Sequence, residues 1–219
     1  LTVADNSYLG LYAINFFDFI QNKETTGLIL EPFTMGKLNM PSSPLQGATA
    51  VNHKKITMRF EHRNGKRHLH FNFPGFDKGK GISGDISLEE LNRDSMLIAT
   101  PFHGDKQAFY YNHKINCLAA DGSFTLGDKK YILDPADSFG VLDWGRGVWS
   151  YKNNWYWGSA SGLVDGQPFG FNIGYGFGDT SAATENMLFY HGVAHKLEHV
   201  TFHIDICDYL KPWKFTSSD

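Results

Sequence analysis

The chain has 219 residues, 42% of them hydrophobic and 20% charged, and its formal net charge is -3. This composition suits two small globular domains or one large all-β domain, and it excludes an intrinsically disordered chain. The charge balance provides no basic surface for nucleic acid, and no apolar run reaches the roughly 18 residues that a transmembrane helix needs.

Strand-like runs and turn signals alternate along the whole chain. In chain order, the runs are ITMRFEH, HLHFNF, QAFYYNHKI, KYIL, PFGFNIGYG and VTFHIDI, which alternate in polarity or are rich in aromatic and β-branched residues. The turn signals are Asn64-Gly65, Asp121-Gly122, Gly127-Asp128, Asp165-Gly166 and His191-Gly192. SLEELNRDSM, near Ser87, is a short and less favoured helix candidate. The pattern predicts an all-β, antiparallel fold with a mild break at residues 101–107.

The Asp165-Gly166 pair predicts a two-residue hairpin turn between WYWGSASGLV and QPFGFNIGYG. This turn would place Trp157 opposite Gly174 and Trp155 opposite Gly176. On the other face, small residues would stand opposite large ones, as in the pair of Gly158 and Ile173. Matching large with small at each pair supports the register independently.

The predicted register gives this hairpin two chemically different faces. One is a packing face that carries Tyr156, Phe169, Phe171, Ile173 and Tyr175. The other carries Trp155, Trp157, Ser159, Ser161, Asn172 and three glycines. Because a packed core would fill the glycine positions, we expect the second face to be the wall of a cavity. The alternative is that another strand or loop packs onto the glycines.

Asp143, Trp144, Arg146 and Trp149 come shortly before this hairpin. Burial beside indole rings would keep a proton on Asp143 and make it a general acid, whereas a nearby Arg146 guanidinium would hold it ionised in an ion pair. The sequence leaves both roles open. Asp143 and Arg146 are therefore the catalytic candidates.

The segment GFGDTSAATENMLFY supplies further polar groups for the mouth of the expected cavity, namely Asp179, Glu185 and Asn186. Asp143 and Glu185 would form a carboxylate pair of the kind that glycosidases use, if their separation suited. For Asp179, turn formation is the default role.

The histidines favour strands over a metal site. Four of them recur at four-residue intervals: His191, His195, His199 and His203. The spacing would align them on a helix, but Gly192 and the alternation in VTFHI favour a hairpin. His68 and His70 share one side of a strand, which we expect to be polar and to face solvent. Since the chain also has no Gly-x-Ser-x-Gly motif, P-loop or dinucleotide fingerprint, we predict no metal and no cofactor.

The cysteines and the chain ends bear on cellular location. Cys117 and Cys207 have no metal-type spacing and make no disulfide framework, so we expect two buried, reduced thiols in a cytoplasmic protein. The chain starts at Leu1, and its last residues, WKFTSSD, read as the start of a hairpin. We therefore expect a piece of a longer protein, and the question of a signal peptide stays open.

Several segments together resemble a bacterial family known as domain of unknown function 2804. They are GKLNMPSS, DSMLIATPF, AFYYNHKINCLAADG, DSFGVLDWGRGVW, NWYWGSASG and GFNIGYGFGDTSAATEN. The likeness covers nearly the whole chain. Members of that family extend beyond both of its ends, which agrees with the truncated look.

A more distant similarity is to the double lipocalin-like (calycin) proteins, such as AttH-like proteins, carotenoid 1,2-hydratases and fungal Diels–Alderases. It lies in residues 109–149, with a Tyr-Tyr strand, a Gly turn and an aspartate-tryptophan motif, and in the Trp-x-Trp hairpin that follows. The resemblance implies two β-barrels, an extended apolar ligand and a proton-donating aspartate at the position of Asp143. The chain departs from the family pattern at Leu142, Trp144 and Arg146, so the resemblance implies the fold more strongly than the hydratase reaction.

We therefore predict two lipocalin-like β-barrels, residues 1–104 and 105–219, the first without its start and the second without its end. The predicted function is binding of an apolar or amphipathic small molecule in a Trp-lined cavity, and its enzymatic version is acid-catalysed hydration, isomerisation or cyclisation of an alkene by Asp143. The predicted ligand-binding residues are Tyr111, Trp144, Trp149, Trp155, Trp157, Asn172, Glu185 and Asn186. The alternatives are a carbohydrate-binding or glycoside-processing protein and a non-catalytic structural barrel. The oligomeric state is left open.

Overall fold

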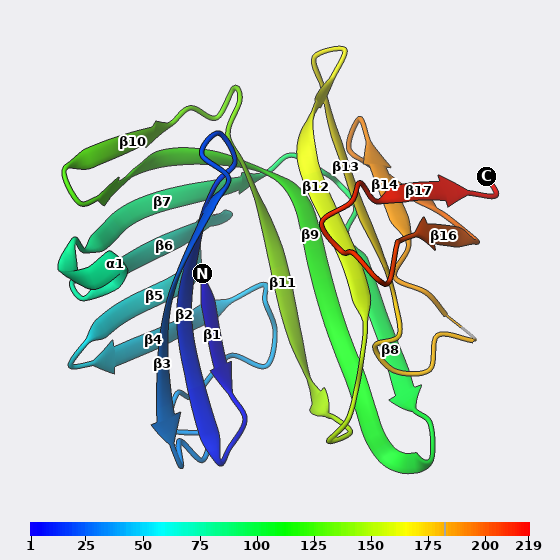
Figure 1. Cartoon of the computed structure of the whole chain (residues 1–219), viewed down its shortest axis with the longest axis horizontal. Helices are drawn as coiled ribbons and strands as arrows, with labels where there is room; N and C mark the ends of the chain where they lie inside the picture. The colour runs from blue at the N-terminus through cyan, green and yellow to red at the C-terminus, as the bar shows by residue number, and fades with distance from the viewer. Residues whose placement is uncertain (182) are drawn as a thin grey trace. The chain divides into compact units, whose positions relative to one another are not determined.

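The computed structural model is antiparallel and all-β apart from one four-residue helix, as predicted (Figure 1). It describes residues 1–181 and 183–219, except for the side chain of residue 106. The chain forms two compact units that interleave along the sequence. The first unit consists of Leu1–Glu89 and Ala120–Ser138, and the second of Glu90–Ala119 and Phe139–Asp219.

The first unit packs two sheets around one hydrophobic core. The smaller sheet has the order β1-β2-β3, with β1 (Thr2–Asp5), β2 (Leu9–Asp18) and β3 (Lys23–Pro32). The larger runs β10-β9-β7-β6-β5-β4, with β4 (Gly47–His53), β5 (Ile56–Arg63), β6 (Lys66–Phe73), β7 (Ile82–Glu90), β9 (Asp105–Leu126) and β10 (Lys129–Leu133). A short helix, α1 (Phe76–Gly79), follows β6. Alternate residues such as Met58 and Phe71 are buried, so the period of two puts one side of each strand in the core.

The second unit also packs one sheet against another. Its first layer consists of β8 (Met96–Phe102), residues 105–119 of β9 and β11 (Phe139–Val148). The second layer has the order β12-β13-β14-β15, with β12 (Tyr156–Val164), β13 (Gln167–Tyr175), β14 (Met187–Tyr190) and β15 (Val193–Lys196). A separate hairpin joins β16 (Val200–His203) to β17 (Lys214–Ser217). The layers meet at a core that includes Tyr110, Cys117 and Phe189.

Most of the predicted turns are where the sequence placed them. Asn64-Gly65, Asp165-Gly166 and His191-Gly192 all join adjacent antiparallel strands, and each of these six residues has the positive φ that such turns require. Gly127 begins the turn between β9 and β10. SLEELNRDSM is not a helix, since it covers the end of β7, a short turn and the start of β8.

Asp121-Gly122 is a correction, because it lies inside β9 and makes no turn. Gly122 has a φ of 121°, and a Cβ at this position would come within 2.3 Å of the Asp85 backbone oxygen. The glycine therefore serves a close approach between β9 and β7. In sequence, such a glycine and a turn glycine look the same.

In the part of the chain that the structure describes, the sheets are open and none closes into a barrel. The antiparallel fold class is thus established, whereas the two lipocalin-like barrels at residues 1–104 and 105–219 stay a prediction. No helix among the described residues has the length and apolarity to cross a membrane.

Replacing Phe71 by alanine tests the first core. Phe71 is fully buried between the two sheets of the first unit, so Phe71→Ala should lower the free energy of unfolding by about 3–5 kcal/mol. Phe19→Ala is the matched control, because Phe19 lies exposed at the tip of the β2–β3 hairpin and its loss should change stability by no more than about 0.5 kcal/mol. Urea unfolding measures both, and similar losses would contradict the described core.

Candidate functional site

The β12–β13 hairpin has the predicted register. Trp157 stands opposite Gly174, Gly158 opposite Ile173 and Ala160 opposite Phe171. The turn at Asp165-Gly166 therefore fixes which side chains share a face, and the two predicted faces are confirmed.

The hollow expected beside the glycines is absent, because other groups of the protein fill those positions. A Cβ on Gly174 would lie 2.5 Å from a carboxylate oxygen of Glu185, and one on Gly170 would lie 2.8 Å from Cys117 Sγ. A Cβ on Gly176 would meet the Asn154 backbone oxygen just as closely. The alternative interpretation is correct: the glycines let β9 and the Glu185 segment approach β13 closely.

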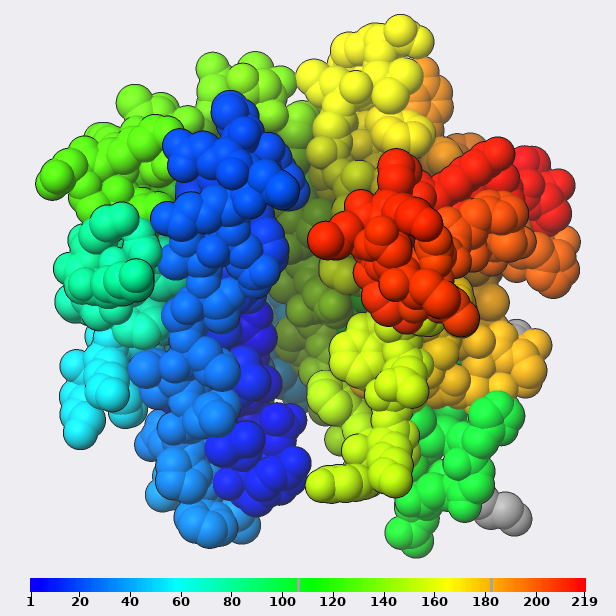
Figure 2. Space-filling model, viewed as in Figure 1, coloured from blue at the N-terminus to red at the C-terminus, as the bar shows by residue number. Residues whose placement is uncertain are grey.

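The outer face of the hairpin is a packing face that the C-terminal segment covers in part. The Tyr156 and Tyr209 hydroxyls are 2.8 Å apart, and the Tyr156 ring lies 6.0 Å from that of Trp213. Figure 2 shows this segment, in red, lying on the yellow strand β12. The candidate site therefore lies on the opposite, inner face of the hairpin.

Lys114 occupies the centre of the inner face. Its ammonium lies 2.9 Å from Glu185 Oε2, 3.3 Å from Asp143 Oδ2 and 4.3 Å from the ring centre of Trp157. The side chains of Lys114 and Glu185 are 4% and 9% exposed, whereas that of Asp143 is 47% exposed. A buried ammonium thus links a buried carboxylate to one that reaches the surface.

Two asparagines orient the carboxylates of this charged group, and a third ties β9 to the hairpin. Asn112 Nδ2 donates to Asp143 Oδ1 over 2.7 Å, and Asn172 Nδ2 donates to Glu185 Oε2 over 3.1 Å. Asn172 Oδ1 in turn accepts from Trp157 Nε1 over 2.8 Å. Asn116 Nδ2 donates to Phe171 O and to Ser159 Oγ, which ties β9 to both strands of the hairpin. Buried polar groups held in this way form a fixed network.

Arg146 is not the ion-pair partner of Asp143. In β11, Asp143 is paired with Lys114 and Arg146 with Tyr111, and residues three apart in a strand point to opposite faces. On that other face, the Arg146 guanidinium lies 5.8 Å from the Tyr111 ring centre, and the rings of Tyr111 and Trp144 are 6.0 Å apart. Asp143 and Lys114 therefore belong to one group, and Arg146, Tyr111 and Trp144 to another.

An aromatic cluster adjoins the charged group on the inner face. Phe177 lies 4.3 Å from Tyr110, 5.4 Å from Trp149 and 5.1 Å from Trp155, between ring centres. Burial raises the pKa of Tyr110, and the negative charges of Asp143 and Glu185 raise it further. Tyr110 therefore lies within electrostatic reach of both carboxylates and in ring contact with Phe177. We call Tyr110, Trp149, Trp155, Trp157 and Phe177 the aromatic surface.

Asn186 has a structural place beside this surface. Its Oδ1 accepts from the backbone N–H of Gly174 over 2.9 Å, and its backbone oxygen accepts from Lys196 Nζ over 3.1 Å. These bonds hold the segment that carries Glu185 against β13. Asn186 is therefore a positioning residue for Glu185.

Sequence reasoning missed Lys114, Asn112, Tyr110 and Phe177. The first three alternate along β9 and are buried, which is unusual for a lysine and an asparagine. The run YYNHKIN carried a usable signal, since polar residues at every second position of a central strand point toward a polar interior or toward solvent. The pairing of Lys114 with Asp143 depended on the β9–β11 register, which has an irregularity between Gly140 and Leu142.

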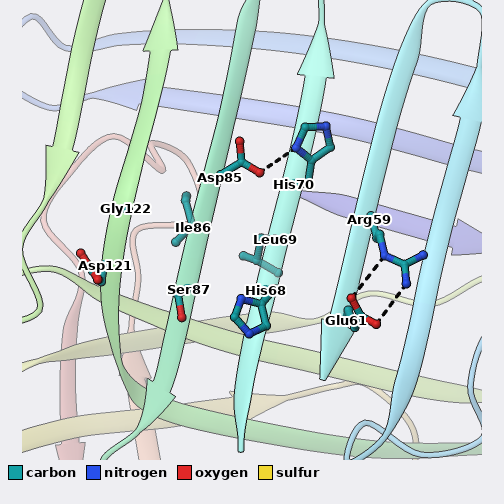
Figure 3. A pocket seen from close by; sticks show the side chains of 10 residues that line it. All are labelled: Arg59, Glu61, His68, Leu69, His70, Asp85, Ile86, Ser87, Asp121 and Gly122. Atoms are coloured by element: carbon teal, nitrogen blue, oxygen red, sulfur yellow. Dashed lines mark hydrogen bonds and ion pairs between the residues drawn. The ribbon is translucent and has the colours of Figure 1, made fainter. Parts of the chain in front are cut away.

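The histidine predictions concern strands elsewhere. His195 lies in β15 and His203 in β16, so the four-residue spacing does not align the ring of one with the next. Figure 3 shows His68 and His70 on one side of β6, where His70 pairs with exposed Asp85 over 2.8 Å. Among the described residues, no group of three His, Cys, Asp or Glu side chains is arranged to hold a metal ion.

The two thiols differ from expectation in one respect. Cys117 is buried, as predicted, but Cys207 is exposed. Cys207 lies in a turn between β16 and β17, where its N–H donates to Asp205 Oδ1 over 2.9 Å. Turn backbone needs solvent or local partners, which keeps this segment at the surface.

The filled glycine positions generate a stability prediction. Gly170→Ala should cost about 1–3 kcal/mol, because the new methyl group would press on Cys117 Sγ and on the Ala160 backbone oxygen. Gly162→Ala, on the partner strand, has nothing within 4 Å of its Cβ position and should change stability by no more than about 0.5 kcal/mol. Chemical unfolding of both variants decides the point. If Gly170→Ala leaves the free energy of unfolding unchanged, the space beside residue 170 is empty, as the sequence predicted.

The buried ammonium generates a second prediction. Lys114→Met leaves the Glu185 carboxylate buried without its cation, and it should lower the free energy of unfolding by about 3–5 kcal/mol. Adding Glu185→Gln removes the uncompensated charge while keeping an acceptor for Asn172. The double variant should therefore be more stable than Lys114→Met alone, as measured by urea unfolding. If the second change brings no recovery, the charge of Glu185 is not the source of the loss.

One comparison with known proteins covers the whole chain. No curated protein and no solved structure matches it. One family model, described as domain of unknown function (DUF2804), matches residues 1–219. The match covers every element described above, from β1 to β17, and agrees with the segments that resembled this family. The chain therefore belongs to the family described as domain of unknown function (DUF2804).

Proposed function

We propose that the second unit binds an apolar or amphipathic small molecule on its aromatic surface, beside Asp143. The observation that carries the proposal is the exposure of three large rings, one of which, Trp157, lies beside the Lys114 ammonium. Trp149, Trp155 and Trp157 are 48%, 55% and 37% exposed, although each offers a large apolar area that folding normally buries. Exposed apolar groups gathered in one place are typical of a binding surface.

The arrangement of the rings supports binding more than simple packing. Trp149 and Trp155 both meet Phe177 nearly edge-on, with interplanar angles of 88° and 81°. Both indoles nevertheless stay about half exposed and can take part in other contacts. The loop between these two tryptophans lines a shallow hollow with Tyr151, Lys152, Asn153 and Asn154. Half-exposed rings with a few polar groups nearby match the composition of small-molecule sites.

The lipocalin-like barrels belong to this proposal. Antiparallel strands joined by short hairpins occur in such barrels and in other antiparallel folds, so the open sheets described above support the barrels only in their strand direction. In this proposal, the ligand lies against the inner surface of the predicted barrel. The exposed aromatic surface would then be the part of the wall that meets the ligand.

The enzymatic version assigns Asp143 to the hydration, isomerisation or cyclisation of an alkene. Both of its oxygens face donors, since Asn112 Nδ2 donates to Oδ1 and Lys114 Nζ lies beside Oδ2. In this version, Asp143 gives a proton to the alkene and, as the carboxylate held by Asn112 and Lys114, takes one back when water adds to the cation or the cation loses a neighbouring proton. Trp155 and Trp157 would stabilise the intermediate cation through their rings.

Carbohydrate binding is the second candidate, and the exposure of the tryptophans favours it. Open indole faces serve as stacking platforms for sugar rings as well as for apolar ligands. Glycoside hydrolysis has less support, because Glu185 is buried and the Lys114 ammonium lies between it and Asp143. Two carboxylates that share one ammonium leave no room between them for the scissile bond.

A fluorescent apolar probe tests the main proposal. N-phenyl-1-naphthylamine, which is neutral, should bind the whole chain saturably and quench its tryptophan fluorescence. Trp155→Ala should weaken this binding about tenfold, because truncating a central aromatic contact of an interface costs more than about 1 kcal/mol. Leu210→Ala is the matched control, since Leu210 is exposed in the same unit and lies outside the aromatic surface.

The outcomes separate the candidates. Equal affinities of the Trp155→Ala and Leu210→Ala variants, or a lack of saturable binding, would rule out the apolar ligand. Binding on a glycan array that is lost in Trp155→Ala would support the carbohydrate candidate instead. Mass spectrometry of molecules that co-purify with the chain from a cell lipid extract would then identify the natural ligand.

A further inference from the structure

Donors and acceptors are unequally used at the charged group of the second unit. The Lys114 ammonium faces Glu185, Asp143 and the Trp157 ring, and the amide groups of Asn112 and Asn172 are directed at oxygen atoms. Two buried acceptors, Asn112 Oδ1 and Asn116 Oδ1, have no hydrogen-bond partner. Buried polar atoms without partners are few in native proteins and call for an explanation. The site therefore lacks donors and has acceptors to spare.

The net charge of this group also favours a positively charged partner. One ammonium, that of Lys114, is shared by two carboxylates, so the group carries one excess negative charge when all three are ionised. The excess is accessible at one place, because the Asp143 side chain is half exposed whereas those of Lys114 and Glu185 are buried. An anionic ligand would meet Asp143 first and would find the one nearby cation already paired.

The aromatic surface adds a second, independent attraction for positive charge. Trp157 already holds the Lys114 ammonium over its ring, which shows that this indole is placed to bind a cation. Trp149 and Trp155 present similar rings at the exposed side of the same surface. Indole faces attract organic cations, and several rings around one position recognise quaternary ammonium groups.

We propose that the ligand of the aromatic surface carries an amine or quaternary ammonium group that lies against Asp143, while its apolar part lies on Trp149 and Trp155. This inference rests on the proposed function, which it narrows from apolar or amphipathic ligands to organic cations. The head group supplies the positive charge that the site lacks. Trp149 and Trp155, which both contact Phe177, receive the apolar part.

Two small probes of the same shape test the inference. Benzyltrimethylammonium is a cation, and neopentylbenzene is its neutral isostere, with carbon in place of nitrogen. Titration followed by tryptophan fluorescence should show the cation binding about tenfold more tightly, from the combined ring and carboxylate attractions. The preference should shrink when salt is raised from low to high concentration, because Asp143 is half exposed and its charge is screened.

Two variants locate the source of the preference. Asp143→Asn should remove most of the tenfold preference and leave the affinity for neopentylbenzene unchanged. The neutral probe thereby also reports whether the variant keeps its folded surface. Glu198→Gln is the matched control, since it removes an exposed carboxylate of the same unit outside the site and should preserve the preference.

Each result decides one point. If both probes bind equally, the ligand is not selected for charge, and the inference fails while the proposed function stands. If 3-phenylpropionate, an anion of similar size, binds most tightly, the inference is likewise wrong. If none of the three probes binds, the proposed function fails and the inference with it. A preference for the cation that survives Asp143→Asn would also overturn the assignment to Asp143.

Discussion

The buried ammonium of Lys114 is the interaction on which the second unit depends. Moving an ammonium from water into a protein costs several kcal/mol unless charges and hydrogen bonds replace its hydration. Glu185, Asp143 and the Trp157 ring replace it from three segments that are distant in sequence: the residues just before β14, β11 and β12. Each of these segments must therefore pack in a fixed position against β9. Asn112 and Asn172 complete the arrangement by fixing the two carboxylates, and Asn116 ties β9 to β13.

The glycines of β13 follow from this arrangement. Because Glu185 must reach Lys114 from beyond the hairpin, its carboxylate passes directly over residue 174, where a side chain has no room. Gly170 makes the same allowance for Cys117, whose backbone has the left-handed conformation, with a φ of 58°. The combination of large rings and missing side chains, which in sequence looks like a hollow, is here a sign of close packing between two sheets. Exposure of the tryptophan rings, and not empty space beside the glycines, is what suggests a ligand.

Local patterns in the sequence predicted the fold well and the site only in part. The hairpin register was predictable because a two-residue turn and the alternation of side chains fix it within about twenty residues. The pair of Lys114 and Asp143 was not, since it depends on strands 29 positions apart and on an irregularity in β11. The proposed pair of Asp143 and Arg146 was avoidable: with both in a strand, an odd separation puts them on opposite faces. Asp121-Gly122 shows the other limit, because a glycine needed for contact with β7 has the appearance of a turn.

Stability alone does not account for the charges between the two sheets. Apolar residues of similar volume at positions 114 and 185 would stabilise such an interface about as well as the ion pair does, and in some proteins they do so better. Apolar residues at these positions would not hold a carboxylate in place at the surface. Lys114 and Asn112 hold the half-exposed Asp143 carboxylate in place, so under the proposed function its position would not depend on a ligand. Fixing a charge before the ligand arrives lowers the entropic cost of binding, and it lets a small exposed group discriminate between ligands of the same shape.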